Sequence, residues 1–308
     1  MKASRITRFG PPEVIEFVDV EVPTPAEGQV LVRVRAAGVG PWDGLIRTGR
    51  SALVPAEALP VILGSDISGV VEAVGGEHSL FRPGDEVFGV TNARFTGGYA
   101  QFAVAESAKI AKRPMSLSFA QAASVPVVAV TAWQMLFEHA KLERGQSVLI
   151  LGASGNVGGY AVQLAHARGI RVHAVGAADD AERLRSLGAE QILDRNAQLD
   201  GLDVDAVIDT VGAELQQRSL AALKPGGVLV SAVSPLDEAL QRRTGVRSVF
   251  FYVDVTTRSL DAIAALIEAQ SLATRIGVVL PLSDAQTAHE MLEGTKRAPR
   301  GKIVLSND

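Results

Sequence analysis

Alternation of apolar and charged residues dominates the first third of the chain. Residues 30–39 (VLVRVRAAGV) begin with strict alternation, which is typical of a strand with one buried face. Further strand-like segments follow at 67–76, 85–90 and 99–106, separated by turns that contain glycine and proline. Short strands at this spacing predict a small β-barrel or sandwich.

The pattern changes near Leu117, where strand-like and helix-like segments begin to alternate. The expected strands are 147–152, 171–176, 191–194, 204–212, 227–233 and 246–255, and the expected helices are 117–142, 157–168 and 180–187. Continuously apolar strands between helices predict a parallel sheet covered on both faces. After a helix at 284–293, residues 300–308 form one more strand, and periodicity does not decide which sheet it joins.

Composition and charge exclude several classes of protein. A length of 308 residues suggests about two domains. With a net charge of −4, we expect no general attraction to nucleic acid or to anionic membranes. The chain has no cysteine, which excludes disulfides and thiolate zinc sites. No signal peptide is recognisable, and the apolar run 122–132 is too short to span a bilayer. We therefore expect a cytoplasmic protein.

The strongest chemical signal is a glycine-rich loop between a strand and a helix. The strand 147–152 runs into Gly152-Ala-Ser-Gly155-Asn-Val-Gly158 and then directly into a helix. Glycines let the backbone approach a pyrophosphate, and the helix N-terminus supplies unpaired N–H groups and partial positive charge. A turn without a ligand is the alternative, but the strand–helix–strand context favours a dinucleotide. The residues expected to hold it are Gly152, Ser154, Gly155, Asn156, Val157 and Gly158.

The end of the second strand bears on the choice of cofactor. A NAD-binding chain often has an acid there to bind the ribose hydroxyls, whereas this chain has Gly176, which leaves room for a 2′-phosphate. Asp179 and Asp180 follow closely and would repel that phosphate. The nearest cations in sequence are Arg183, Arg185 and Arg195. The pattern favours NADPH and leaves NADH open.

Several motifs together resemble the medium-chain dehydrogenase/reductase superfamily, and more closely its quinone oxidoreductase branch, which includes zeta-crystallin. The motifs are RAAGVGPWDGLIRTG, PVILGSDISGVVEAVG, FRPGDEVFGV, FTGGYAQFAV, VTAWQMLFEHAKLERGQSVLI, the glycine loop, DTVG, LKPGGVLVS and RGKIVL. They are collinear and cover essentially the whole chain.

The resemblance implies the domain organisation. A β-rich, GroES-like substrate domain would comprise residues 1–116 and 283–308, and a doubly wound Rossmann domain would comprise residues 117–282. The terminal RGKIVL would then rejoin the first domain. The strand at 246–255 would be an edge strand that pairs across a homodimer, which agrees with the cost of leaving a long apolar edge exposed.

Zinc-dependent relatives carry a metal ligand in the segment that matches Val39–Pro41, and a histidine followed by an acid where this chain has Ser65-Asp66. Here Gly40 and Ser65 occupy those two positions, and neither supplies the thiolate or imidazole ligand that catalytic zinc prefers. The five histidines are scattered without metal-ligand spacing. We therefore expect no metal site. Without a metal to polarise a carbonyl, hydride transfer favours acceptors that are already electrophilic.

By the same resemblance, Thr131 would lie near the nicotinamide, and backbone groups around Val233 and Phe251 would hold its carboxamide. Lys302 would lie near the pyrophosphate, although an exposed strand lysine is an equally good interpretation. A helical threonine that binds a local carbonyl is the alternative for Thr131, and sheet or dimer packing explains the Phe251 side chain.

Trp42, Phe95 and Tyr99 are expected to line an acceptor pocket, because flat aromatic walls suit flat quinones. Tyr99 also fits the start of a buried strand. Many relatives have an asparagine at the position of Gly40, where it helps to place the nicotinamide ribose and the substrate. Relatives also often have a basic residue near Asp180 and a tyrosine near Arg195. We hypothesise that Arg195 compensates for Asp180 at the 2′-phosphate.

The expected function is an NADPH-dependent, zinc-independent reductase for quinones or α,β-unsaturated carbonyls. An NADH-dependent reductase of the same fold is one alternative. A protein that binds NADPH but acts only as a structural or regulatory partner is another. No general acid is assigned from the sequence, so the source of the proton stays open.

Overall fold

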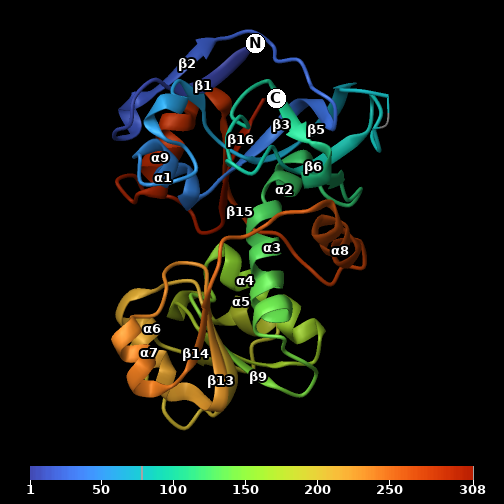
Figure 1. The fold of residues 1–308 in the computed structure, drawn as a ribbon. Helices are drawn as coiled ribbons and strands as arrows, with labels where there is room; N and C mark the ends of the chain where they lie inside the picture. Colours follow the sequence, from blue (N-terminus) through green and yellow to red (C-terminus); the bar gives the residue numbers. More distant parts are fainter. Residues whose placement is uncertain (78, 308) are drawn as a thin grey trace. The chain divides into compact units, whose positions relative to one another are not determined.

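The computed structural model describes residues 1–77 and 79–307, and its chain divides into two compact units. Unit 1 comprises Met1–Val127 and Val255–Asp308, and unit 2 comprises Val128–Asp254 (Figure 1). No helix in these described ranges is long and apolar enough to cross a membrane.

Unit 1 is built on a β-rich core. A seven-stranded sheet has the order β15-β16-β3-β5-β6-β8, with β7 also paired to β3, and a three-stranded sheet has the order β2-β1-β4. The strands are β1 (Lys2–Ile6), β2 (Ile15–Asp19), β3 (Gln29–Val39), β4 (Val61–Ile62), β5 (Asp66–Val74), β6 (Glu86–Val90), β7 (Phe102–Glu106), β8 (Ile110–Lys112), β15 (Ile276–Pro281) and β16 (Lys302–Ser306). The helices are α1 (Pro41–Arg47), α2 (Phe119–Ala123), α8 (Thr257–Glu268) and α9 (Ala285–Leu292).

The last strand returns to the first part of the chain, as the resemblance implies. β16 pairs antiparallel with β3, so that Ile303 lies opposite Val39, and parallel with β15. In Figure 1 the red terminal strand lies beside the blue β3. The middle of β16 (Ile303, Val304 and Leu305) is buried in the sheet, and this burial explains why so short an apolar segment forms a strand.

The two units do not divide at the expected domain boundaries. Residues 117–127 and 255–282 group with unit 1 by packing, whereas the resemblance assigns them to the Rossmann domain. α2 packs on β3 and β5, and β15 pairs with β16. These contacts connect both segments to the β-rich sheet.

Unit 2 is a doubly wound parallel sheet. Its order is β11-β10-β9-β12-β13-β14, which is 3-2-1-4-5-6 in the order of these six strands along the chain. The strands are β9 (Ser147–Leu151), β10 (Arg171–Val175), β11 (Gln191–Leu193), β12 (Val204–Asp209), β13 (Leu223–Ser231) and β14 (Arg247–Phe250). The strand order reverses between β9 and β12, and ligands of such folds bind beyond the carboxyl ends of the strands at this point.

Helices accompany the parallel strands of unit 2, as this class of fold requires (Figure 1). They are α3 (Pro126–Trp133, which begins in unit 1), the π-helical turn η4 (Gln134–His139), α4 (Asn156–Ala167), α5 (Ala181–Ser186), α6 (Ala213–Arg218) and α7 (Glu238–Thr244). α4 packs on β9 and β10, and α5 packs on β11. Leu215 of α6 and Leu240 of α7 join the apolar cluster on Leu149 and Val207 of the sheet.

In unit 2, side chains take the backbone partners of two expected strands and so shorten them. The strand expected over 204–212 ends at Asp209, whose carboxylate accepts the N–H groups of Val211 and Gly212. The strand expected over 246–255 is regular only over Arg247–Phe250. Beyond it, the backbone of Asp254 exchanges two hydrogen bonds with the amide of Gln134.

Candidate functional site

The glycine loop of unit 2 lies at the carboxyl end of β9, where the strand order reverses. Gly152 has a φ of +77°, a conformation that favours glycine, and a Cβ there would lie 2.5 Å from Thr210 Oγ1. A Cβ on Gly158 would lie 2.2 Å from the Gly152 carbonyl oxygen and 2.7 Å from Ala153 Cα. The first turn of α4 therefore packs directly on the loop backbone. Neither Gly152 nor Gly158 has room for a side chain.

The beginning of α4 suits an anionic group. Gly155 is the N-cap residue and supplies no side-chain cap, so the first N–H groups of this twelve-residue helix keep the partial positive charge of an uncapped terminus. Gly155 is exposed, as an approach to the loop requires. Asn156 and Val157, which follow it, are half-buried. The loop, the helix terminus and the glycine packing together fit the pyrophosphate of a dinucleotide.

Gly176 is a glycine for a reason that the sequence did not reveal. A Cβ there would lie 2.6 Å from Leu184 Cδ1 and 2.9 Å from Ser154 Oγ. The Ser154 hydroxyl lies beside it and accepts the N–H of Ala177 at 3.0 Å. Packing therefore opposes any side chain at position 176, including the acid that would bind ribose hydroxyls.

The charge of Asp180 is balanced by a neighbour on its own helix. Asp180 is buried, and its Oδ2 lies 3.2 Å from Arg183 Nη1. Arg183, not Arg195, is therefore the cation that pairs with this carboxylate. Arg195 is exposed and follows β11, whose Leu193 carbonyl accepts the N–H of Gly176 at 3.2 Å. Its guanidinium is thus carried by the loop next to the end of β10.

A buried carboxylate organises the loops after β12 and β13. Asp209 accepts the Ser231 hydroxyl at 2.7 Å and a Gln216 amide N–H at 2.9 Å. Ser231 Oγ in turn accepts the N–H of Val233 at 3.1 Å and of Ser234 at 3.3 Å. The backbone at Val233 is therefore held rigidly at the carboxyl end of the sheet, and its own N–H is already used.

The other residues expected at the nicotinamide also lie in unit 2. Thr131 is a buried residue of α3. The ring of Phe251 contacts the ring of His139, with 4.2 Å between the ring centroids. The side chain of Phe251 is thus explained by packing, as expected, and only its backbone is available for binding.

Unit 1 contains a second cluster, centred on a buried ion pair. Lys302 Nζ lies 2.9 Å from Asp66 Oδ2, and both side chains are almost completely buried. Asp66 Oδ1 also accepts the N–H of Val127, in the first turn of α3, at 3.2 Å. Burial raises the pKa of Asp66, and Lys302 and this N–H oppose the shift. Lys302 is therefore not a solvated strand lysine, since its ammonium group is buried and bound to Asp66.

Trp42 covers this ion pair. The Lys302 ammonium lies 4.4 Å from the centroid of the indole, a cation–π distance. Trp42 Nε1–H donates to Ser65 Oγ at 3.2 Å, and the edge of Phe95 packs on the indole at 6.3 Å. Trp42 and Phe95 are both partly exposed, so the structure brings two of the three expected acceptor-wall residues together.

Tyr99, the third expected wall residue, is completely buried. Its hydroxyl donates to Asp43 Oδ2 at 2.9 Å, and its ring fills the space beside Gly64. Asp43 also accepts the N–H of Gly40 at 2.8 Å, and burial raises the pKa of Asp43 to about 7. Tyr99 is thus a core residue and not part of a pocket wall. Through Asp43 it supports the loop that carries Gly40 and Trp42.

The raised pKa of Asp43 predicts a pH dependence of stability. Its folded-state pKa of about 7 exceeds the ordinary value of 3.8, so the contribution is complete below pH 3.8 and is lost as the pH rises through about 7. The free energy of unfolding of the wild type, relative to Asp43→Asn, should fall across this window by at most about 1.4 kcal/mol per pH unit. Urea unfolding of both proteins at several pH values measures it.

The control is Asp19→Asn. Asp19 is exposed and its pKa is lowered by Lys2, so any pH dependence that it causes has the opposite sign. A constant difference between wild type and Asp43→Asn from acid to neutral pH would contradict the assignment. If Asp43→Asn does not fold, Tyr99→Phe removes one donor to the ionised carboxylate and should steepen the loss of stability toward neutral pH.

The positions that match zinc ligands do not form a donor set. Gly40 has no side chain, and Ser65 accepts the indole N–H. Across residues 1–77 and 79–307, no group of three or more His, Asp or Glu side chains could hold a metal ion. Of the five histidines, His78 lies outside the described residues. The residues present at these positions do not fit the catalytic zinc site of zinc-dependent dehydrogenases.

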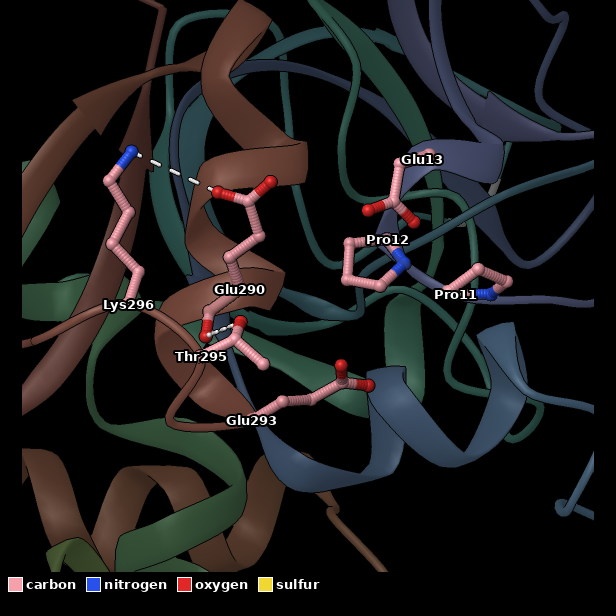
Figure 2. A pocket seen from close by; sticks show the side chains of 7 residues that line it. All are labelled: Pro11, Pro12, Glu13, Glu290, Glu293, Thr295 and Lys296. Atoms are coloured by element: carbon pink, nitrogen blue, oxygen red, sulfur yellow. Dashed lines mark hydrogen bonds and ion pairs between the residues drawn. The ribbon is translucent and has the colours of Figure 1, made fainter.

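An open pocket of about 460 Å³ lies elsewhere on unit 1, between the turn at Pro12–Val14 and the end of α9 (Figure 2). Three carboxylates face it, and two of them are paired: Glu290 with Lys296 at 3.8 Å, and Glu293 with Arg47. Such a lining repels phosphate groups. We assign this pocket no part in cofactor binding.

Sequence reasoning missed Asp43, Asp66 and the role of Ser65. Asp66 had only a weak signal: it lies next to the start of an expected strand, and a carboxylate that the strand buries has to find a partner. Its partner Lys302 is 236 residues away along the chain, and no local pattern connects the two. The Gly40–Trp42 contact also had no sequence signal, because it depends on the side-chain rotamer.

Comparison with known proteins agrees with this geometry. Residues 26–115 match the family profile described as alcohol dehydrogenase GroES-like domain, and residues 187–305 match zinc-binding dehydrogenase. Human quinone oxidoreductase is 31% identical over 328 residues, covering 99% of this chain and 97% of the relative. The structure of the quinone oxidoreductase from Coxiella burnetii superimposes with a TM-score of 0.91 at 32% identity, covering 100% of this chain and 99% of that one.

A further solved structure bears on the cofactor. A mycobacterial protein solved in complex with NADPH has a TM-score of 0.86 at 29% identity, with 99% of both chains covered. The full-length match to quinone oxidoreductases, the GroES-like and Rossmann-type sheets, and the glycine loop at the strand-order reversal all lead to one assignment. The chain belongs to the medium-chain dehydrogenase/reductase superfamily, in its quinone oxidoreductase branch, and is an NAD(P)H-dependent oxidoreductase.

Proposed function

We propose that the protein reduces quinones or α,β-unsaturated carbonyls with NADPH and without zinc. The observation that carries the proposal is the packing of Gly158 on Gly152 at the strand-order reversal, which shapes a loop for a pyrophosphate. The absence of a ligand side chain at Gly40 supports a reaction without a metal. Similarity to quinone oxidoreductases supports the class of acceptor.

The residues of unit 2 would bind and orient the dinucleotide. The loop Gly152–Gly158 and the start of α4 would hold the pyrophosphate, while Thr131 and the backbone at Val233 and Phe251 would fix the nicotinamide. The bound cofactor supplies the hydride. The protein contributes position, since no Lewis acid is required for an acceptor that is already electrophilic. Lys302 would have a structural role inside unit 1, as the countercharge of the buried Asp66 carboxylate.

We propose NADPH as the preferred cofactor, with Arg195 at its 2′-phosphate. Arg183 already neutralises Asp180, and Arg195 is exposed beside the end of β10. Arg195→Ala should raise the Kd for NADPH about tenfold and leave the Kd for NADH unchanged, since a charge-assisted bond is worth about 1.5–3 kcal/mol. Titration of nicotinamide fluorescence measures both constants.

The control for this prediction is Arg185→Ala, which removes an exposed arginine of α5. An equal change in NADPH affinity in both variants would mean that net charge, not a specific contact, is responsible. Unchanged NADPH affinity in Arg195→Ala would refute the assignment. Tighter binding of NADH than of NADPH by the wild type would favour the alternative, an NADH-dependent reductase, which the carboxylates of Asp179 and Asp180 support.

The test of the reaction class is a matrix of two cofactors and four acceptors. NADPH and NADH are each mixed with a simple benzoquinone, a polycyclic ortho-quinone, an enone and a saturated aldehyde, and the loss of nicotinamide absorbance is followed. We expect turnover of a quinone or the enone with NADPH, and none of the aldehyde. Cofactor binding without turnover of any acceptor would instead indicate the non-catalytic alternative.

We also propose a homodimer that forms through the edge of the unit 2 sheet, and a cytoplasmic location as expected from the sequence. β14 is the last strand of that sheet, and Phe250 packs on the exposed Tyr252 just beyond it. An unpaired sheet edge favours pairing with a second copy. Sedimentation of the wild type and of a Val249→Lys variant tests this proposal, since the lysine should shift a dimer toward monomer.

A further inference from the structure

We infer that Trp42 determines acceptor specificity, by offering its indole as the surface on which a flat, uncharged, electron-poor ring stacks. Gly40 is glycine because the indole occupies the space of a side chain at that position. The inference rests on the proposed function and narrows it, because it makes quinones the preferred acceptors over small alkyl enones.

Residues 40 and 42 share a single volume. A Cβ on Gly40 would lie 2.3–2.5 Å from Cη2, Cζ2 and Cζ3 of Trp42. The φ of Gly40 is −138°, which is extended backbone that any residue adopts. The glycine is therefore required by the indole and not by the backbone. Any side chain at position 40 has to displace Trp42.

The indole is held in place before a ligand arrives. Its Nε1–H donates to Ser65 Oγ at 3.2 Å, the Lys302 ammonium lies 4.4 Å from the ring centroid, and Phe95 packs at 63° to the ring. A side chain fixed by three partners loses little rotamer freedom on binding. This is the arrangement expected of a rigid recognition surface.

The cluster presents an aromatic and uncharged surface. Ser65, Asp66 and Lys302 are buried, and Trp42 above them is partly exposed. Asp66 balances the charge of Lys302, so this ion pair offers no net charge to a ligand. An electron-rich indole favours offset stacking with an electron-poor ring, whereas a small alkyl enone contacts only part of it.

The first test compares two acceptors in three proteins. The kcat/KM for a polycyclic quinone and for methyl vinyl ketone is measured with NADPH in wild type, Trp42→Ala and Trp42→Phe. The ratio of the two kcat/KM values should fall about three- to tenfold in Trp42→Ala, the range that an aromatic pair provides. Trp42→Phe should retain most of the ratio. The Kd for NADPH should be the same in all three proteins.

Gly40→Ala tests the shared volume. If alanine at position 40 acts only by displacing the indole, the variant should lose the quinone preference as Trp42→Ala does. The double variant Gly40→Ala/Trp42→Ala should then be no worse than Trp42→Ala alone, because the methyl group has nothing left to displace. Additive losses in the double variant would overturn the shared-volume argument.

Fluorescence supplies a readout that does not depend on turnover. The chain has two tryptophans, so in a Trp133→Phe background Trp42 is the only source of tryptophan emission. Quinone added without cofactor should quench this emission with a saturable Kd. Linear, unsaturable quenching would mean that the quinone only collides with the indole, and it would overturn the inference.

The outcomes separate this inference from the proposed function. If wild type reduces both acceptors and Trp42→Ala slows both by the same factor, Trp42 does not select the acceptor and the inference falls, while the proposed function stands. If wild type reduces neither acceptor, the proposed function fails. The fluorescence titration then still decides whether the indole binds the quinone ring.

Discussion

Replacing Gly158 with alanine is expected to weaken NADPH binding by at least about tenfold and to destabilise unit 2 by about 1–3 kcal/mol. The added methyl group would lie 2.2 Å from the Gly152 carbonyl oxygen, and its neighbours at that distance are backbone atoms. They cannot rotate away, so the start of α4 must move from the loop. Urea unfolding and NADPH titration measure the two effects.

The matched control is Gly159→Ala, the next residue of the same helix. A Cβ there would lie 3.1 Å from Arg183 Nη2, the end of a flexible side chain, and 3.8 Å from the Ala153 carbonyl oxygen, which is ordinary contact. Alanine is a better helix former than glycine by about 1 kcal/mol, so this variant should be as stable as the wild type or more stable. If the two variants behave alike, the packing of α4 on the loop does not limit cofactor binding.

Replacing Lys302 with methionine is expected to destabilise the protein by about 3–5 kcal/mol, because it leaves the Asp66 carboxylate buried without a countercharge. The Trp42 indole loses its cation in the same step. The double variant Asp66→Asn/Lys302→Met removes the buried charge as well and should recover part of the loss. Chemical unfolding of wild type, both single variants and the double variant completes the cycle.

Lys2→Met is the control for Lys302→Met. Lys2 pairs with Asp19 at 2.7 Å, but both side chains are well exposed to solvent. Exposed pairs contribute about 0–1 kcal/mol, so this variant should unfold nearly as the wild type does. A similarly small effect of Lys302→Met would contradict the view that the ion pair holds the Trp42 cluster and the start of α3.

The glycine loop could be predicted because its requirements are local. A buried strand, a turn that only glycine fits and a helix N-terminus follow one another within 147–158, so the physical argument needs no distant partner. The parallel sheet follows from the same alternation of strands and helices. The return of β16 to the first sheet came from resemblance, since five strand residues carry no information about which strand they join.

The Trp42 cluster could be predicted only in part. Trp42 was singled out for its flat ring, but its neighbours Asp66 and Lys302 come from opposite ends of the chain. Tyr99 and Trp42 are both aromatic residues that could line a pocket, and the sequence does not separate them. Only the tertiary structure shows that Tyr99 is buried and that Trp42 is partly exposed. Gly176 shows the same limit: nothing in the sequence indicates that Leu184 and Ser154 leave no room for a side chain at this position.

The central claim is hydride transfer from NADPH to an activated acceptor without a metal. It is tested most directly by the rate of NADPH oxidation with a polycyclic quinone, using protein treated with a chelator and shown to be free of zinc. We expect the same rate before treatment, after treatment and after zinc is added back. Loss of activity on treatment and recovery with zinc, together with reduction of a saturated aldehyde, would contradict it.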